Sequence, residues 1–173
     1  MRKRSWLGIL ILAVATLAPE MALGAPAVVI LVRHAEKETT PADDPGLTPA
    51  GRQRAEELAR VVAAWKASGA KVRALFSSEM KRMRETLGPL EAATGLRVIP
   101  VKAKDTADLV KRILAVKGGV VVVAGHSNTV PAAIEALGGP AGIAIADAEF
   151  DRLFAVTGAG GKAVVVAMRY GNP

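Results

Sequence analysis

The 173-residue sequence contains only two histidines, and both stand close behind strongly apolar segments. His34 lies two residues beyond Val28–Val32, and His126 lies two residues beyond Val120–Ala124. Short, continuous, valine-rich runs are typical of strands buried on both faces, as in a parallel sheet. Parallel strands end at a common edge, where α/β proteins bind ligands. We therefore expect the two imidazoles to converge on a ligand site, although each could instead be a hydrogen-bonded core histidine.

A third strand end adds polar groups suited to an anion. Val72–Phe76 runs into Ser77-Ser78 and then into a helix, with Arg82 in its first turn. The N-terminus of a helix attracts anions through its dipole and its unpaired N–H groups. Arg33 and Arg82 would add two guanidinium forks, which suit phosphate or carboxylate. For Arg82 alone, a solvated basic helix face is the competing interpretation.

The elements that must position these groups alternate between strand and helix. This alternation predicts a three-layer α/β/α sandwich with a mostly parallel sheet and a C-terminal antiparallel hairpin. Thr48-Pro49 predicts the start of the first helix, and Gly88-Pro89 predicts a kink or break in the second. The expected strands are Val28–Val32, Val72–Phe76, Leu96–Val101, Val120–Ala124, Phe150–Thr157 and Ala163–Tyr170, and the expected helices are Pro49–Ala67, a segment between Ser78 and Gly95, Asp105–Leu114 and Val130–Leu137.

The N-terminus has the features of a secretory signal peptide. A basic stretch, Arg2–Arg4, precedes the apolar run Trp6–Ala18, and small residues follow before Ala25. The apolar run is shorter than the ~20 residues that a spanning helix needs. We expect residues 1–24 to be a signal peptide, residues 25–173 to be one domain, and the protein to be periplasmic or secreted. An uncleaved membrane anchor is the alternative.

Composition narrows the classes of chemistry. The sequence has no cysteine, which excludes disulfides, thiolate nucleophiles and zinc–thiolate sites. The formal net charge is +7, but no run of five basic residues occurs and aromatics make up 3% of the chain. Nucleic-acid binding is therefore not expected, because single-strand binders rely on aromatic stacking platforms.

Four segments of the chain resemble one known family. Arg33-His34-Ala35 resembles the Arg-His-Gly signature of the histidine phosphatase (phosphoglycerate mutase-like) superfamily. Further resemblances follow in the family's order: Leu47–Ala55 to the segment entering its first helix, Ser77–Arg82 with Thr86 to the element bearing its second arginine, and Gly125–Ser127 to the element bearing its second histidine. They extend over residues 28–137 and indicate a small, single-domain branch.

The resemblance implies a two-step phosphoryl transfer. His34 would attack phosphorus to form a phosphohistidine, and water would then release phosphate. Arg33, Arg82 and His126 would hold the three non-bridging oxygens. Two guanidinium groups and a protonated His126 would neutralise a dianion, so we expect neither metal nor cofactor. Ala35 replaces the family's glycine and would place a methyl group near the phosphate, which its small size should allow.

The acid that protonates the leaving group is less well defined. The family supplies an acid after its third strand, which makes Asp105 the candidate, although Asp105 could simply be a helix N-cap. Glu36 is the second candidate because it lies beside the nucleophile. Glu36, Lys37, Ser127 and Asn128 are candidate substrate contacts.

The sequence thus predicts an exported, metal-independent, histidine acid phosphatase-like hydrolase of a small phosphomonoester. A phosphate- or phosphosugar-binding protein with little turnover, on the same fold, is the alternative. No membrane contact is expected after signal cleavage.

Overall fold

A six-stranded sheet runs through the centre of the computed structural model, which describes residues 25–67 and 69–171. Its strands are β1 (Val28–Arg33), β2 (Val72–Ser77), β3 (Val98–Pro100), β4 (Val120–Gly125), β5 (Arg152–Thr157) and β6 (Val164–Arg169). They lie in the order β3-β2-β4-β1-β5-β6. The first four form parallel pairs, whereas β5 is antiparallel to β1 and β6 to β5. The predicted mostly parallel sheet and C-terminal hairpin are confirmed.

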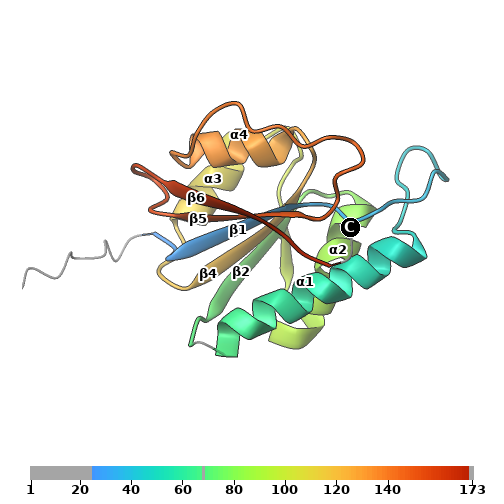
Figure 1. The fold of residues 1–173 in the computed structure, drawn as a ribbon, viewed down its shortest axis with the longest axis horizontal. Coiled ribbons are helices and arrows are strands. Elements are labelled where there is room, and N and C mark those ends of the chain that lie inside the picture. Colours follow the sequence, from blue (N-terminus) through green and yellow to red (C-terminus); the bar gives the residue numbers. More distant parts are fainter. Residues whose placement is uncertain (1–24, 68, 172–173) are drawn as a thin grey trace, which may run out of the picture.

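Two pairs of helices cover the two faces of the sheet (Figure 1). They are α1 (Pro49–Ala67), α2 (Lys81–Thr94), α3 (Thr106–Leu114) and α4 (Thr129–Ala136). Side chains of α1 and α2 join one buried cluster, and side chains of α3 and α4 join the other. The chain therefore forms the predicted α/β/α sandwich.

Strand β1 shows why the sheet needs both helical layers. Val29 and Leu31 enter the cluster beneath α3 and α4, while Ile30 and Val32 enter the cluster beneath α1 and α2. All four side chains are fully buried. Alternate residues of a strand point to opposite faces, so an uninterrupted apolar run is what a strand between two helical layers requires.

The strand register places the polar residues that follow the strands at one edge. Arg33 of β1 pairs with Gly125 of β4, and Ser77 of β2 pairs with Ala124. The amide of His34 donates to the carbonyl of Gly125, with 2.8 Å between nitrogen and oxygen. The two histidines therefore leave neighbouring strands at the same level.

The start of α1 is tightly joined to the chain that follows β1. Thr48 caps the helix, because its hydroxyl accepts the amide of Gly51 at 3.0 Å, as the Thr48-Pro49 pair predicts. The amide of Thr48 donates to the carbonyl of Glu36 at 3.0 Å. A Cβ on Gly51 would lie 2.1 Å from that same carbonyl oxygen, so only glycine fits at this contact.

Two local expectations differ from the structure. Helix α2 continues through Pro89, because Leu87 and Leu90 on either side of it are buried and packing holds the helix against the sheet. Strand β3 is shorter than the expected strand 96–101. The amide of Val98 donates to the Glu91 carboxylate rather than to the sheet, and Pro100 has no N–H to donate.

The predicted signal peptide lies outside the described residues. In the part that is described, no helix is both long and apolar enough to cross a membrane.

Candidate active site

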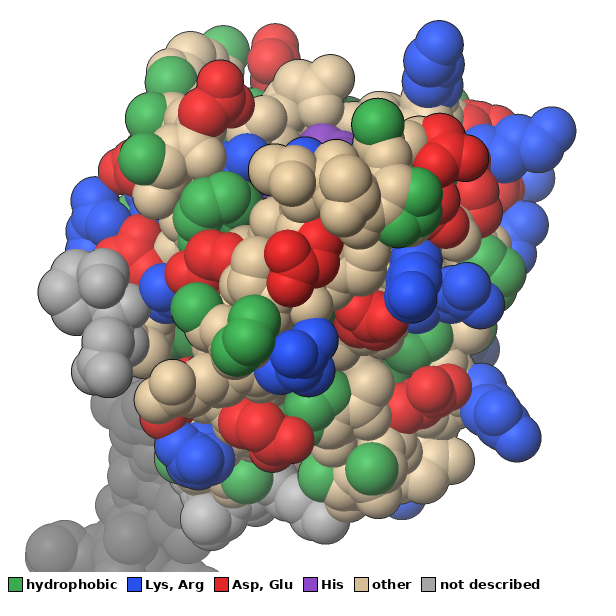
Figure 2. Space-filling view, turned by 90° about the vertical axis from the view of Figure 1, so that its right-hand side faces the viewer, with side chains coloured by type: hydrophobic (Ala, Val, Ile, Leu, Met, Phe, Trp, Pro, Cys, Tyr) green, Lys and Arg blue, Asp and Glu red, His purple; other side chains and the backbone are tan. Residues whose placement is uncertain are grey.

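The ends of β1, β2 and β4 form a recess at the carboxyl edge of the parallel strands. Figure 2 views the molecule from this end. A small area of a histidine side chain is visible there, next to Lys or Arg atoms and partly covered by neighbouring residues. The His34 and His126 rings lie 5.8 Å apart, centroid to centroid, with their planes at 76°. Arg33, Ser77 and Ser78 are also buried here. The predicted convergence of the strand ends is therefore what the structure shows.

His34 is held in one orientation and in its neutral form. Its Nδ1 lies 2.8 Å from the carbonyl oxygen of Ala35, so Nδ1 carries the proton and donates to that oxygen. The side chain is buried, and burial lowers the pKa of His34 to about 4. The neighbouring charges of Arg33 and Arg82 contribute to this lowering. The Nε2 lone pair is therefore available at neutral pH, as a nucleophile requires.

Arg33 is fixed by the segment that precedes β5. Its Nη1 donates to the carbonyls of Ala146 at 2.9 Å and Asp147 at 2.8 Å, and its guanidinium lies 4.2 Å from the ring centroid of Phe150. Burial lowers the pKa of Arg33, and the charge of Arg82 acts in the same direction. These carbonyls hold the guanidinium rigidly while leaving its Nε unused.

Two buried guanidinium N–H groups lack an acceptor. The Nε atoms of Arg33 and Arg82 are both buried, and neither has a hydrogen-bond partner among the described residues. Buried polar groups are nearly always hydrogen-bonded, and exceptions call for a functional explanation. Two such donors beside a neutral imidazole are chemically suited to bind an oxyanion.

His126 sits in a more open position than His34. Its Nε2 lies 3.4 Å from the Ser78 hydroxyl, and its backbone amide donates to the Thr129 hydroxyl at 2.8 Å. Burial and the charges of Arg82 and Arg33 lower its pKa, while Glu79 opposes them. The protonated His126 was expected with a dianion bound, and that state stays a prediction. A bound dianion would raise the pKa and restore the charge.

Thr86 connects the loop that carries His34 and Ala35 to the helix that carries Arg82. Its hydroxyl accepts the amide of Ala35 at 3.0 Å and donates to the carbonyl of Arg82 at 2.7 Å. Both Thr86 and Ala35 are fully buried. The Ala35 methyl group packs in a buried cluster with Leu47 and Ala55, so the fold accommodates alanine at this position, as its small size led us to expect.

Both candidate acids are engaged elsewhere. Asp105 accepts the amide of Asp108 at 2.9 Å as the N-cap of α3, although it also lines a narrow cavity of about 30 Å³ beside His126. Glu36 is paired with Arg54, whose Nη2 lies 2.7 Å from Oε1. Neither carboxylate is positioned by a contact with His34 or His126.

The side chains of Lys37, Ser127 and Asn128, the other predicted substrate contacts, form no hydrogen bond with the described residues of the recess. Lys37 and Asn128 are exposed, and Ser127 is half-buried. Other groups that surround the site were not predicted from the sequence, namely Phe150, the carbonyls of 146–149, and Glu79. Glu79 lies three residues before Arg82, and this proximity in the sequence is the one feature that could have indicated that Glu79 lies near the site.

No three His, Asp or Glu side chains in residues 25–67 and 69–171 are placed to hold a metal ion together.

A family model matches the part of the chain that builds half of this site. Residues 29–105 match the histidine phosphatase superfamily, branch 1. This part of the chain, residues 29–105, therefore belongs to the histidine phosphatase superfamily. The matched range holds Arg33, His34 and Arg82, while His126 is placed in the site by the sheet register. No match was found among proteins of curated function.

Solved structures share the fold at low sequence identity. A protein histidine phosphatase SixA complexed with tungstate has a TM-score of 0.67 at 18% identity, covering 82% of this chain and 96% of its own. A mycobacterial glucosyl-3-phosphoglycerate phosphatase with inorganic phosphate has a TM-score of 0.62 at 15% identity, covering 84% and 97%. A phosphoglycerate mutase from Plasmodium falciparum has a TM-score of 0.56 at 16% identity, covering 84% and 93%.

Proposed function

We propose that the protein is a phosphatase that hydrolyses phosphomonoesters through a phosphohistidine on His34. The observation that carries the proposal is a neutral imidazole with a fixed tautomer beside two buried guanidinium N–H groups that lack acceptors. The match of residues 29–105 to the histidine phosphatase superfamily supports the same chemistry.

The reaction proceeds in two displacements at phosphorus. The Nε2 of His34 attacks, an N–P bond forms, and the P–O bond to the alcohol breaks. Water then attacks the phosphohistidine, the N–P bond breaks, and phosphate leaves with His34 regenerated. The N–H groups of Arg33 and Arg82 stabilise the charge on the equatorial oxygens in both steps, which is the main demand of phosphoryl transfer.

The alcohol oxygen needs a proton as it leaves. Asp105 is the better placed candidate, because it lines the cavity that His126 also lines. To act, its carboxyl would have to exchange its capping bond to Asp108 for the leaving oxygen. Glu36 would have to leave Arg54. A general acid contributes about 10²–10⁴-fold, so this choice affects turnover rather than binding.

One observation favours a binding protein as the second candidate. Both candidate acids already hold other partners, so phosphate could be bound without efficient release of an alcohol. The fold and the oxyanion site would then be retained with little turnover.

The finer features of the proposal come from the sequence. We propose a histidine acid phosphatase-like enzyme that works without metal, is exported after cleavage of residues 1–24, and acts on small phosphorylated molecules rather than on nucleic acid or membranes. Amino-terminal sequencing of protein recovered from the periplasm or medium tests export, and unchanged activity in a chelator tests metal independence.

The central test is turnover of p-nitrophenyl phosphate by wild type and His34→Asn. A phosphatase hydrolyses the ester and, when quenched in base, retains an acid-labile phosphoenzyme that the variant lacks. If wild type binds inorganic phosphate but shows no turnover, the binding-protein alternative is correct.

A further inference from the structure

A large cavity adjoins the phosphate site on the side of α2 and β3. It measures about 780 Å³, and Arg82 and His126 form part of its wall. The rest of its wall consists of Glu79, Met80 and the segment 100–104 that follows β3. A phosphate group held between the arginines would leave this volume unfilled, and pockets of this size accommodate whole small molecules.

The segment 100–104 is fixed before any ligand binds. The amide of Val101 donates to the carbonyl of Ser77 at 2.8 Å, and the amide of Ala103 donates to the Glu79 carboxylate at 3.1 Å. The amide of Asp105 closes a turn on the carbonyl of Lys102 at 2.8 Å. The start and the middle of the segment are therefore held by bonds to Ser77 and Glu79, and its end is held by a local turn.

This segment presents two lysines to the cavity. Lys102 and Lys104 both line it, both are exposed, and neither forms an ion pair within the described residues. The nearest carboxylates are committed, Glu79 to the amide of Ala103 and Asp105 to the amide of Asp108. With Arg82, the cavity has three cationic side chains against one carboxylate in its wall.

We propose that Lys102 and Lys104 form a subsite for a second anionic group of the substrate. The substrate class is then a phosphomonoester whose alcohol portion carries a carboxylate or a second phosphate. Met80, Pro100 and Val101 supply the apolar wall against which its carbon skeleton packs. This inference rests on the proposed phosphatase function and specifies its substrate.

The experiment compares matched substrate pairs. Glycerol 3-phosphate and 3-phosphoglycerate differ by a carboxylate, and glucose 6-phosphate and glucose 1,6-bisphosphate differ by a phosphate. The protein is expected to favour the doubly anionic member of at least one pair in kcat/KM. In Lys102→Gln/Lys104→Gln, that preference is expected to fall by about tenfold, since each exposed charged contact is worth a few-fold.

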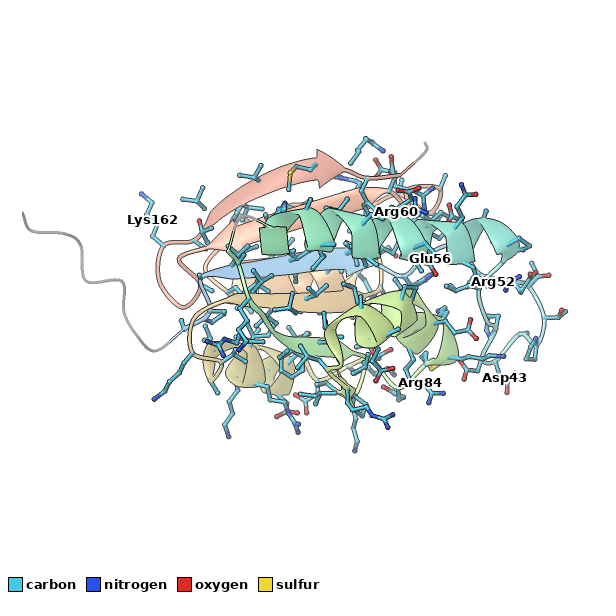
Figure 3. The ribbon with its side chains drawn as sticks, turned by 90° about the horizontal axis from the view of Figure 1, so that it is seen from below. Asp43, Arg52, Glu56, Arg60, Arg84 and Lys162 are labelled. Atoms are coloured by element: carbon cyan, nitrogen blue, oxygen red, sulfur yellow. The ribbon has the colours of Figure 1, made fainter. Side chains whose placement is uncertain are left out.

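Lys162→Gln is the matched control. Lys162 is an exposed lysine in the β5–β6 turn, at the other end of the molecule from the Asp43 loop that follows β1 (Figure 3). Lys162→Gln removes one positive charge, whereas the double variant removes two, and it should leave kcat/KM for both members of each pair unaffected. If it lowers the preference as much as the double variant does, the lysines act only by long-range attraction and the subsite is refuted. An unchanged preference in the double variant also refutes it.

A binding experiment distinguishes failure of this inference from failure of the proposed function. If wild type hydrolyses no substrate, the phosphatase proposal fails, and calorimetric titration with the same pairs tests the subsite directly. Tighter binding of the doubly anionic member, lost in the double variant alone, supports the subsite. Equal affinity for both members overturns it.

Discussion

The two histidines occupy equivalent positions in the sheet and yet have different environments. His34 is 4% exposed, its Nδ1 is bonded to Ala35, and its ring lies 5.9 Å from that of Phe150. His126 is half-buried, lies beside the Ser78 hydroxyl, and faces the large cavity. Only one of the two is covered by the segment before β5.

The difference shows that the end of a strand fixes where a side chain lies, whereas residues from a distant part of the sequence determine its chemical environment. The 146–150 segment covers His34 and holds Arg33, and it comes from more than a hundred residues further along the sequence. Without that cover, His34 would be another half-solvated imidazole. Each of the following predictions removes one part of this asymmetry.

The largest expected effect comes from the nucleophile. His34→Asn removes Nε2, and kcat for p-nitrophenyl phosphate is expected to fall by about 10⁴-fold or more, because loss of a nucleophile removes the covalent route. His126→Asn keeps the nucleophile and removes one oxygen ligand, so a loss of about 10²-fold is expected. Equal losses in steady-state assays would contradict the assignment of different roles.

Stability should depend on pH chiefly through His34. Its pKa is about 4 in the folded protein, against 6.5 for an unperturbed histidine. The unfolded chain therefore binds the proton more readily, and stability rises with pH across this interval. The contribution is complete above pH 6.5 and is lost as the pH falls towards 4, amounting to about 3 kcal/mol.

Denaturant titrations between pH 4.5 and 7 measure this effect. His34→Asn should show a flatter dependence of the free energy of unfolding on pH than wild type. His126→Asn should flatten it less, because the more exposed His126 loses less on protonation. If His34→Asn keeps the wild-type dependence of unfolding free energy on pH, a group other than His34 causes that dependence.

Thr86→Val tests the bond between the nucleophile loop and α2. It leaves the buried amide of Ala35 without an acceptor, which should cost about 1–3 kcal/mol of unfolding free energy. Misplacement of His34 should also lower kcat more than tenfold. Thr94→Val is the control, since Thr94 makes the same bond to the carbonyl four residues earlier, far from the site. Its kcat should stay at the wild-type level.

Phe150→Ala tests the cover over His34 and has the smallest expected effect. Opening the site to water should raise the pKa of His34 from about 4 towards 6.5. The acid limb of the kcat/KM profile should then move to higher pH by about one unit, because kcat/KM reports the free enzyme. A profile with an unmoved acid limb would mean that Phe150 does not keep water from the imidazole.

The sequence was sufficient for the sheet and for the convergence of the strand ends. Val28–Val32 and Val120–Ala124 are apolar throughout, and only strands between two helical layers need that pattern. Thr48 and Pro49 located a helix start through local chemistry alone. Of the kink or break predicted at Gly88-Pro89, the break does not occur, because burial of the surrounding leucines outweighs the local preference of proline.

The rest of the site depends on contacts between distant residues. Nothing near Arg33 in the sequence indicates that its guanidinium donates to carbonyls at 146 and 147. The charge of His126 with phosphate bound stays a prediction, because the pKa of His126 depends on Arg82 and on burial, both of which are set by folding. The roles of Asp105, Glu36, Lys37, Ser127 and Asn128 stay predictions.

The glycine at the start of α1 limits how this protein can be engineered. Gly51 touches the backbone of Glu36, two residues from the nucleophile, so any side chain there would push the helix and the His34 loop apart. A mutant library aimed at new substrates should therefore hold Gly51 constant. Diversity placed instead at the exposed residues of the 100–104 segment would alter the cavity without disturbing the contact between the first helix and the backbone of Glu36.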